Sequence, residues 1–183
     1  MKNQVIAKRY AKAIFEIALE EGRVEEYYQE LKDVLALFKE VPDFERVLAT
    51  PIYPDEVKFR TVEMVADKAG MSPIVKRFLE VLVEKQRVPY LEDVVAVYGK
   101  LMDEHANVAR AQVSAAVELD ETTLELIAES LSKIVGKRVI VEFHQDPDLI
   151  GGVVAKIGDL VLDGSVRTQL KNIKETLKRG ELG

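Results

Sequence analysis

The spacing of apolar residues first changes near residue 105, and this change most constrains how the chain can fold. Up to about residue 105, apolar residues recur every three or four positions, which is the period of an α-helix. After Asn107, the segment VARAQVSAAVEL is rich in valine and alanine and partly alternates, as a strand does. We therefore predict a mainly α protein with two domains: a six-helix bundle over residues 1–105 and a small α+β domain over residues 106–183.

The helices of the first domain are predicted from apolar stripes and from the residues that end them. The predicted ranges are 5–21, 23–39, 43–50, 54–69, 73–85 and about 91–105. Gly22 and Gly70 are typical C-caps, and Ser72 followed by Pro73 is typical of a helix N-terminus. The first helix carries two apolar stripes, and seven of the ten residues 74–83 are apolar. Both helices therefore need neighbours on more than one face.

The second domain is predicted to mix strands with two helices. We expect strands over residues 108–119 and 137–145, and a hairpin over 150–164 that turns at Gly158-Asp159. A helix capped by Asp120 and ended by Gly136 should separate the first two strands, and Ser165 should cap a last helix. Gly151 and Gly152 interrupt an apolar segment, which indicates a bulge or a close approach of two backbones.

The composition gives no support for a catalytic, metal or nucleotide site. The chain has no cysteine and only two histidines, which are not spaced as zinc ligands are. Gly136-Lys137 is followed by arginine instead of serine or threonine, so no phosphate-binding loop is present. Asp146-Pro147-Asp148 is ordinary turn chemistry. We expect no catalytic residue, no metal, no cofactor and no bound nucleotide.

Charge and hydropathy bear on the kinds of partner. The net charge of −6 opposes attraction to nucleic acid, and the one basic segment, residues 165–179, contains no aromatic residue for base stacking. The longest run without a charged residue is eight, far below the ~18 apolar residues of a membrane-spanning helix. The N-terminus has no export signal pattern. We expect a protein that binds other proteins.

Two segments carry a recognisable pattern: AKRYAKAIFEIALEEG near the start and LIGGVVAKIGDLVLDGSVRTQLKNIKETL near the end. The second holds eight signature positions in one 17-residue window: Gly151, Gly152, Gly158, Asp159, Asp163, Gly164, Ser165 and Arg167. Together with the length and the order of elements, they resemble the delta subunit family of bacterial F-type ATP synthases, which is related to the mitochondrial oligomycin-sensitivity-conferring protein. The resemblance covers nearly the whole chain.

The resemblance implies a non-catalytic stator subunit of a proton- or sodium-driven ATP synthase, at the cytoplasmic face of a bacterial cell membrane that it meets only through the complex. Residues 1–105 would bind the catalytic head by taking the N-terminal helix of an alpha subunit between the first and fifth helices. Residues 106–183 would bind the C-terminus of the b subunit in the peripheral stalk, so that rotor torque drives ATP synthesis. The groove residues that it implies are Ile6, Tyr10, Ala13, Ile17, Arg77 and Val81.

Other interpretations remain open on the sequence. An apolar helical stripe can be core instead of interface, and the glycine-rich signature can serve mainly to shape its domain. The basic residues of the last helix, Arg167, Lys171, Lys174, Lys178 and Arg179, are either contacts or a solvated face. A helical adaptor with no role in ATP synthase is the alternative function.

Overall fold

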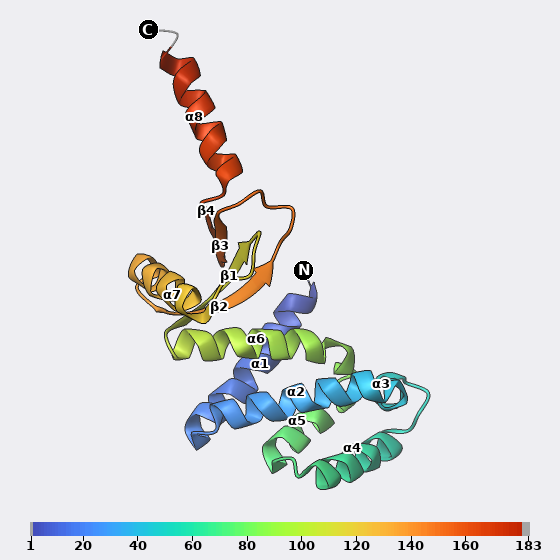
Figure 1. The fold of residues 1–183 in the computed structure, drawn as a ribbon. Helices are drawn as coiled ribbons and strands as arrows, with labels where there is room; N and C mark the ends of the chain where they lie inside the picture. Colours follow the sequence, from blue (N-terminus) through green and yellow to red (C-terminus); the bar gives the residue numbers. More distant parts are fainter. Residues whose placement is uncertain (1, 181–183) are drawn as a thin grey trace. The chain divides into compact units, whose positions relative to one another are not determined.

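A computed structural model of the chain describes residues 2–180, with side chains described for residues 4–177 (Figure 1). The chain divides into two compact units, Met1–Met102 and Asp103–Gly183. The predicted class, a helical bundle followed by a small α+β part, is confirmed. We describe each unit by itself.

Residues 2–105 form six α-helices joined by short connections. They are α1 (Lys2–Glu21), α2 (Val24–Glu40), α3 (Pro42–Ala49), α4 (Asp55–Ala69), α5 (Pro73–Glu84) and α6 (Leu91–His105). A single 3-10 turn, Val88–Tyr90, precedes α6 and was not predicted. Its middle residue is Pro89, which has no backbone N–H to donate and therefore interrupts helical hydrogen bonding between α5 and α6.

The core of the bundle is built from the stripes that helical spacing predicts. On α2, Tyr27, Leu31 and Val34 are fully buried, and Tyr98 of α6 is equally buried. The Tyr98 hydroxyl donates a hydrogen bond to the carbonyl of Val24 at 2.9 Å, so its one polar atom is paired. Burial raises the pKa of Tyr98, because the phenolate form would lose its hydration. This core holds α1, α2 and α6 against one another.

Local capping signals end and start the helices where the sequence predicts. Gly70 ends α4 in the left-handed conformation (φ 64°), which glycine adopts without steric cost. Ser72 then caps α5: its Oγ accepts a hydrogen bond from the N–H of Val75 at 3.3 Å, and Pro73 occupies the first turn. The start of α5 is therefore set by residues next to it in the chain.

In the described part of the second unit, four strands form one sheet in the order β2-β1-β3-β4. The elements are β1 (Val108–Ala115), α7 (Glu121–Val135), β2 (Arg138–Gln145), β3 (Val153–Ile157), β4 (Leu160–Asp163) and α8 (Val166–Gly180). β1 pairs with β2 in parallel, through the α7 crossover, and with β3 in antiparallel; Val113 lies opposite both Phe143 and Ala155. Leu131 of α7 packs with Val113 and its neighbours in a small core.

Three local expectations for this unit need correction. β1 ends at Ala115, earlier than the predicted residue 119. Asp120 stands at the N-cap of α7, but its carboxylate accepts from the Thr123 hydroxyl and bonds no backbone N–H. Gly151 and Gly152 lie before β3, which begins at Val153, and not inside a strand. β1 ends where its pairing with Gln145 and Val153 ends, and Gly152 approaches the backbone of Gly164 before β3 begins.

Candidate functional site

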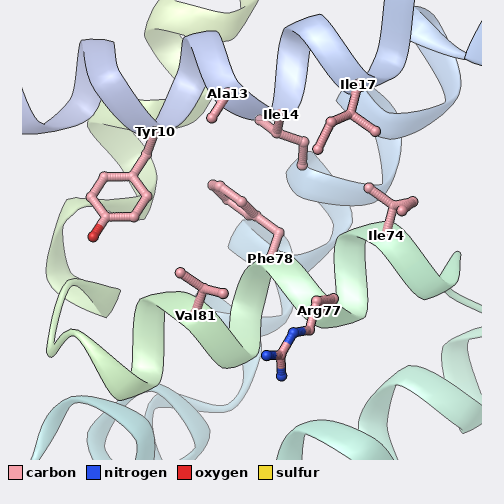
Figure 2. A pocket seen from close by; sticks show the side chains of 8 residues that line it. All are labelled: Tyr10, Ala13, Ile14, Ile17, Ile74, Arg77, Phe78 and Val81. Atoms are coloured by element: carbon pink, nitrogen blue, oxygen red, sulfur yellow. The ribbon is translucent and has the colours of Figure 1, made fainter. Parts of the chain in front are cut away.

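An apolar groove lies between α1 and α5 on the first unit (Figure 2). It encloses a cavity of about 260 Å³. Its lining comes from one face of each helix: Tyr10, Ala13, Ile14, Ile17, Ile74, Arg77, Phe78 and Val81. Seven of these eight side chains are apolar or aromatic, so the groove offers little to a polar ligand and much to an apolar one.

The groove exists because both helices have two apolar faces. On α1, the stripe with Ala7, Ala11 and Ala18 is completely buried in the bundle. The second stripe reaches the groove, where Ile17 remains 38% exposed. α5 likewise buries Leu79 and turns its other face outward. An apolar face that the bundle core does not cover is the physical requirement for docking another helix.

An aromatic contact joins the two walls of the groove. Tyr10 of α1 and Phe78 of α5 meet edge to face, with ring centroids 6.4 Å apart and planes at 70°. In Figure 2 the Phe78 ring points across the groove toward α1, while Ile74 and Ile17 face each other further along. The Tyr10–Phe78 contact therefore links α1 and α5 across the groove.

The structure brings together five of the six residues that the family resemblance implied, namely Tyr10, Ala13, Ile17, Arg77 and Val81. Ile6 is half-buried on α1, four residues before Tyr10, and is not among the lining residues. Sequence reasoning missed Ile14, Ile74 and Phe78 as groove residues. The apolar run 74–83 contained the signal for the last two, but periodicity does not say which of its faces stays open.

Arg77 is the one charged residue in the lining. Its side chain is 70% exposed, and its Nη1 donates to Glu80 Oε2 at 2.8 Å one turn later on α5. An exposed ion pair of this kind is worth roughly 0–1 kcal/mol, so a partner's carboxylate can replace Glu80 at little cost. Arg77 therefore places one weakly paired positive charge at the edge of an apolar groove.

The N-terminus of α5, one wall of the groove, is also tied to α2. Glu30 of α2 accepts two hydrogen bonds through Oε2, from the backbone N of Ser72 at 2.9 Å and from its Oγ at 2.7 Å. Ser72 is buried, and its hydroxyl is both donor to Glu30 and acceptor from Val75. A carboxylate at this end of a helix is also favoured by the helix dipole.

On the second unit, the glycine-rich signature forms a crossing of two backbones. Gly152 has φ +82°, and a Cβ there would stand 2.4 Å from the carbonyl oxygen of Gly164. The two segments are tied by hydrogen bonds from Gly164 N to Val153 O at 2.9 Å and from Val166 N to Gly151 O at 3.0 Å. Of the two structures that the sequence allows, the close backbone approach is the one observed.

The remaining signature residues turn the chain from the sheet into α8. Gly158 (φ +57°) and Asp159 form the turn between β3 and β4. Asp163 accepts from the Ser165 N–H at 2.9 Å and the Thr168 hydroxyl at 2.7 Å, which lowers the pKa of its carboxyl group. Arg167 is exposed on the first turn of α8. These contacts form the junction between β4 and α8.

Among the described residues, no three acidic or histidine side chains gather closely enough to hold a metal ion. Within the same range, no helix combines the length and the apolar character needed to cross a bilayer. The basic residues Lys178 and Arg179 lie outside the described side chains.

Known proteins resemble this chain over its whole length. The family model described as ATP synthase delta (OSCP) subunit matches residues 6–177. The ATP synthase subunit delta of Syntrophobacter fumaroxidans is 50% identical over 184 residues, covering 100% of each chain. A chain of the Toxoplasma gondii mitochondrial ATP synthase hexamer shares the fold, with TM-score 0.63 and 22% identity over 93% of this chain and 96% of that chain. A chain from a Polytomella F-ATP synthase structure refined on the F1 head and rotor covers 54% of this chain and 87% of its own, with TM-score 0.51 and 25% identity.

The family model and the relatives cover both the bundle and the α+β unit, and they are subunits of ATP synthases. The chain belongs to the ATP synthase delta (OSCP) subunit family. It is a non-catalytic component of the stator, a peripheral part of a membrane-bound complex that makes ATP. The alternative of an adaptor with no role in ATP synthase is therefore wrong.

Proposed function

We propose that the chain joins the catalytic head to the peripheral stalk through two separate contacts. Residues 1–105 take the N-terminal helix of an alpha subunit in the α1–α5 groove, and residues 106–183 bind the C-terminus of the b subunit. The joint resists the torque of a proton- or sodium-driven rotor at the cytoplasmic face of the membrane. The open apolar groove carries this proposal.

The size of the groove supports a guest helix of about two turns. Its lining runs from Tyr10 to Ile17 on α1 and from Ile74 to Val81 on α5, and eight helical residues span roughly 12 Å. Apolar side chains at every third or fourth position of a guest would enter between these walls. Polar groups on a guest would add little affinity, because Arg77 is the one charged residue in the lining.

The energy of such a contact is moderate. Burying four or five apolar side chains contributes on the order of 10 kcal/mol at ~1.5–3 kcal/mol each. Association costs about 4–15 kcal/mol in lost freedom, so a good part of that gain is offset. Because head, connector and stalk are joined in series, each contact must hold by itself. A charge pair with Arg77 would strengthen the head contact.

The Polytomella match also supports a contact with the head, because that chain was solved with the F1 head and rotor.

For the stalk contact, support comes from the exposed apolar residues of the second unit. On α8, Leu170, Ile173 and Leu177 are 58%, 56% and 64% exposed. Apolar side chains left in water at helical spacing are characteristic of a surface that another protein covers.

Calorimetry on the full chain tests both contacts. A synthetic peptide that copies the N-terminus of the alpha subunit of the same organism, and the soluble C-terminal segment of its b subunit, are titrated separately and then together. We expect each to bind with one-to-one stoichiometry and without competition. An alpha peptide that binds undiminished when the groove carries a charge, or one that the b segment displaces, contradicts the proposal.

A further inference from the structure

A three-residue pattern recurs along α8. The sequence reads Ser165-Val166-Arg167, then Gln169-Leu170-Lys171, Asn172-Ile173-Lys174 and Thr176-Leu177-Lys178. Each unit consists of a neutral polar residue, an apolar residue and a cation, in that order. The starts of the four units are four, three and four residues apart, which is the spacing of one face of an α-helix.

On a helix this pattern produces three parallel stripes. Successive residues turn by about 100°, since there are 3.6 residues per turn. The apolar stripe is therefore bordered on one side by cations and on the other side by neutral amides and hydroxyls. Ser165, at the start of the neutral flank, is buried. The later described side chains of the flanks are exposed: Arg167, Lys171 and Lys174 on one and Gln169, Asn172 and Thr176 on the other.

The apolar stripe itself faces water. Val166, Leu170, Ile173 and Leu177 are 37–64% exposed. α8 runs away from the sheet after its first turn, as Figure 1 shows. The helix thus has an apolar seam, formed by Val166, Leu170, Ile173 and Leu177, with positive charge along one edge. The net charge of the whole chain is −6.

The one-sided distribution of charge on α8 favours a protein partner over a membrane surface. A helix that lies on an anionic bilayer places basic residues throughout its polar face, so that both flanks reach the headgroups. Here one flank is basic and the other carries no charge, and the rest of the chain is acidic overall. A second helix that packs along the seam meets the two flanks separately, so a one-sided charge favours a helical protein.

We propose that the α8 seam binds an amphipathic helix whose apolar stripe is bordered by Asp and Glu on the side that meets Arg167, Lys171 and Lys174. This inference rests on the proposed function, in which the partner is the b subunit. It deepens that function by naming the helix face, the charge of the partner and the edge on which the charge lies. The seam provides affinity, and the basic flank selects orientation and register.

The test compares two triple variants of the full chain that change the net charge equally. In the first, Arg167→Gln, Lys171→Gln and Lys174→Gln neutralise the basic flank. In the control, Gln169→Glu, Asn172→Glu and Thr176→Glu add the same negative change to the neutral flank of the same helix. Circular dichroism checks that both remain folded, and calorimetry measures binding of the C-terminal segment of the b subunit at low and high salt.

We expect the first variant to lose about tenfold in affinity at low salt and most of its salt dependence, because surface ion pairs are screened by salt. The control should stay within about threefold of the unchanged chain. Equal losses in the two variants, or no loss in the first, overturn the inference while b binding itself remains intact.

A designed peptide separates this inference from the proposed function. If the unchanged chain does not bind the b segment, the stalk assignment is wrong. A 21-residue amphipathic peptide with Glu along one edge of a Leu seam should still bind at least tenfold tighter than the same peptide with Gln at those positions. Equal binding of the two peptides overturns the inference. Flotation with phosphatidylserine vesicles tests the membrane alternative. The inference is overturned if neutralising the basic flank abolishes binding of the chain to these vesicles but leaves binding of the b segment unchanged.

Discussion

Glu30 and Ser72 lie 42 residues apart in the chain and are joined by two hydrogen bonds to a single carboxylate oxygen, at 2.9 and 2.7 Å. Ser72 begins α5, which is one wall of the groove, and Glu30 belongs to α2 in the bundle core. The position of the groove wall therefore depends on a polar contact as well as on apolar packing.

Replacing Glu30 with Ala should destabilise the first unit by about 1–3 kcal/mol, because a buried N–H and hydroxyl lose their acceptor. Glu30→Gln keeps an acceptor oxygen and should lose less. All six tyrosines lie within residues 1–102, so tyrosine fluorescence during urea unfolding reports on this unit. A double-mutant cycle with Ser72→Ala should give a coupling of about 1 kcal/mol, and simple additivity would show that the two residues act independently.

Ala13→Asp places a charge in the apolar groove, and Ala13 is exposed, so the bundle should still fold. We expect the alpha peptide to bind at least about tenfold more weakly, because a carboxylate loses hydration under an apolar guest. Ala96→Asp on α6 is the matched control, since Ala96 is an exposed helical alanine that does not line the groove. Calorimetry compares the two, and a similar affinity for both would remove α1 from the site.

Gly152→Ala and Gly158→Ala separate two effects of glycine in the second unit. Both glycines have positive φ, but only at Gly152 would a Cβ meet backbone, 2.4 Å from the Gly164 oxygen. Strain alone should make Gly158→Ala cost about 1 kcal/mol. The clash should make Gly152→Ala cost more than about 2 kcal/mol. Hydrogen exchange of the β3 and β4 amides measures both, and equal costs would argue against the backbone crossing.

Asp163 predicts how the start of α8 responds to acid. Hydrogen bonds from Ser165 and Thr168 stabilise the charged carboxylate and lower its pKa below the ordinary 3.8. The stabilisation is therefore fully present above pH 3.8 and is lost as the pH falls through the lower folded pKa. Asp163→Asn should weaken protection of the first α8 amides at neutral pH, and the difference from the unchanged chain should vanish in acid. An NMR titration that places the Asp163 pKa above 3.8 would contradict this.

Much of the local structure is predictable because its causes are local. Gly70 and Gly136 end helices by adopting positive φ, and Ser72 starts one through its own hydroxyl. Each of these residues acts on neighbours within four positions of the chain. Where prediction failed, at the end of β1 and the start of β3, propensities were weak, and both boundaries fall where Ala115 pairs with Gln145 and Val153.

The amino-acid sequence alone was enough to predict the change of period near residue 105 and the fold class, and to identify the family signature. Periodicity and motifs are properties of consecutive residues. It also showed that α1 and α5 are apolar on two faces. Only the tertiary structure decided which face stays open, that Phe78 reaches Tyr10, and that Glu30 meets Ser72. The reason is physical: burial of apolar surface is non-directional, so a stripe shows that a face needs cover but not what covers it.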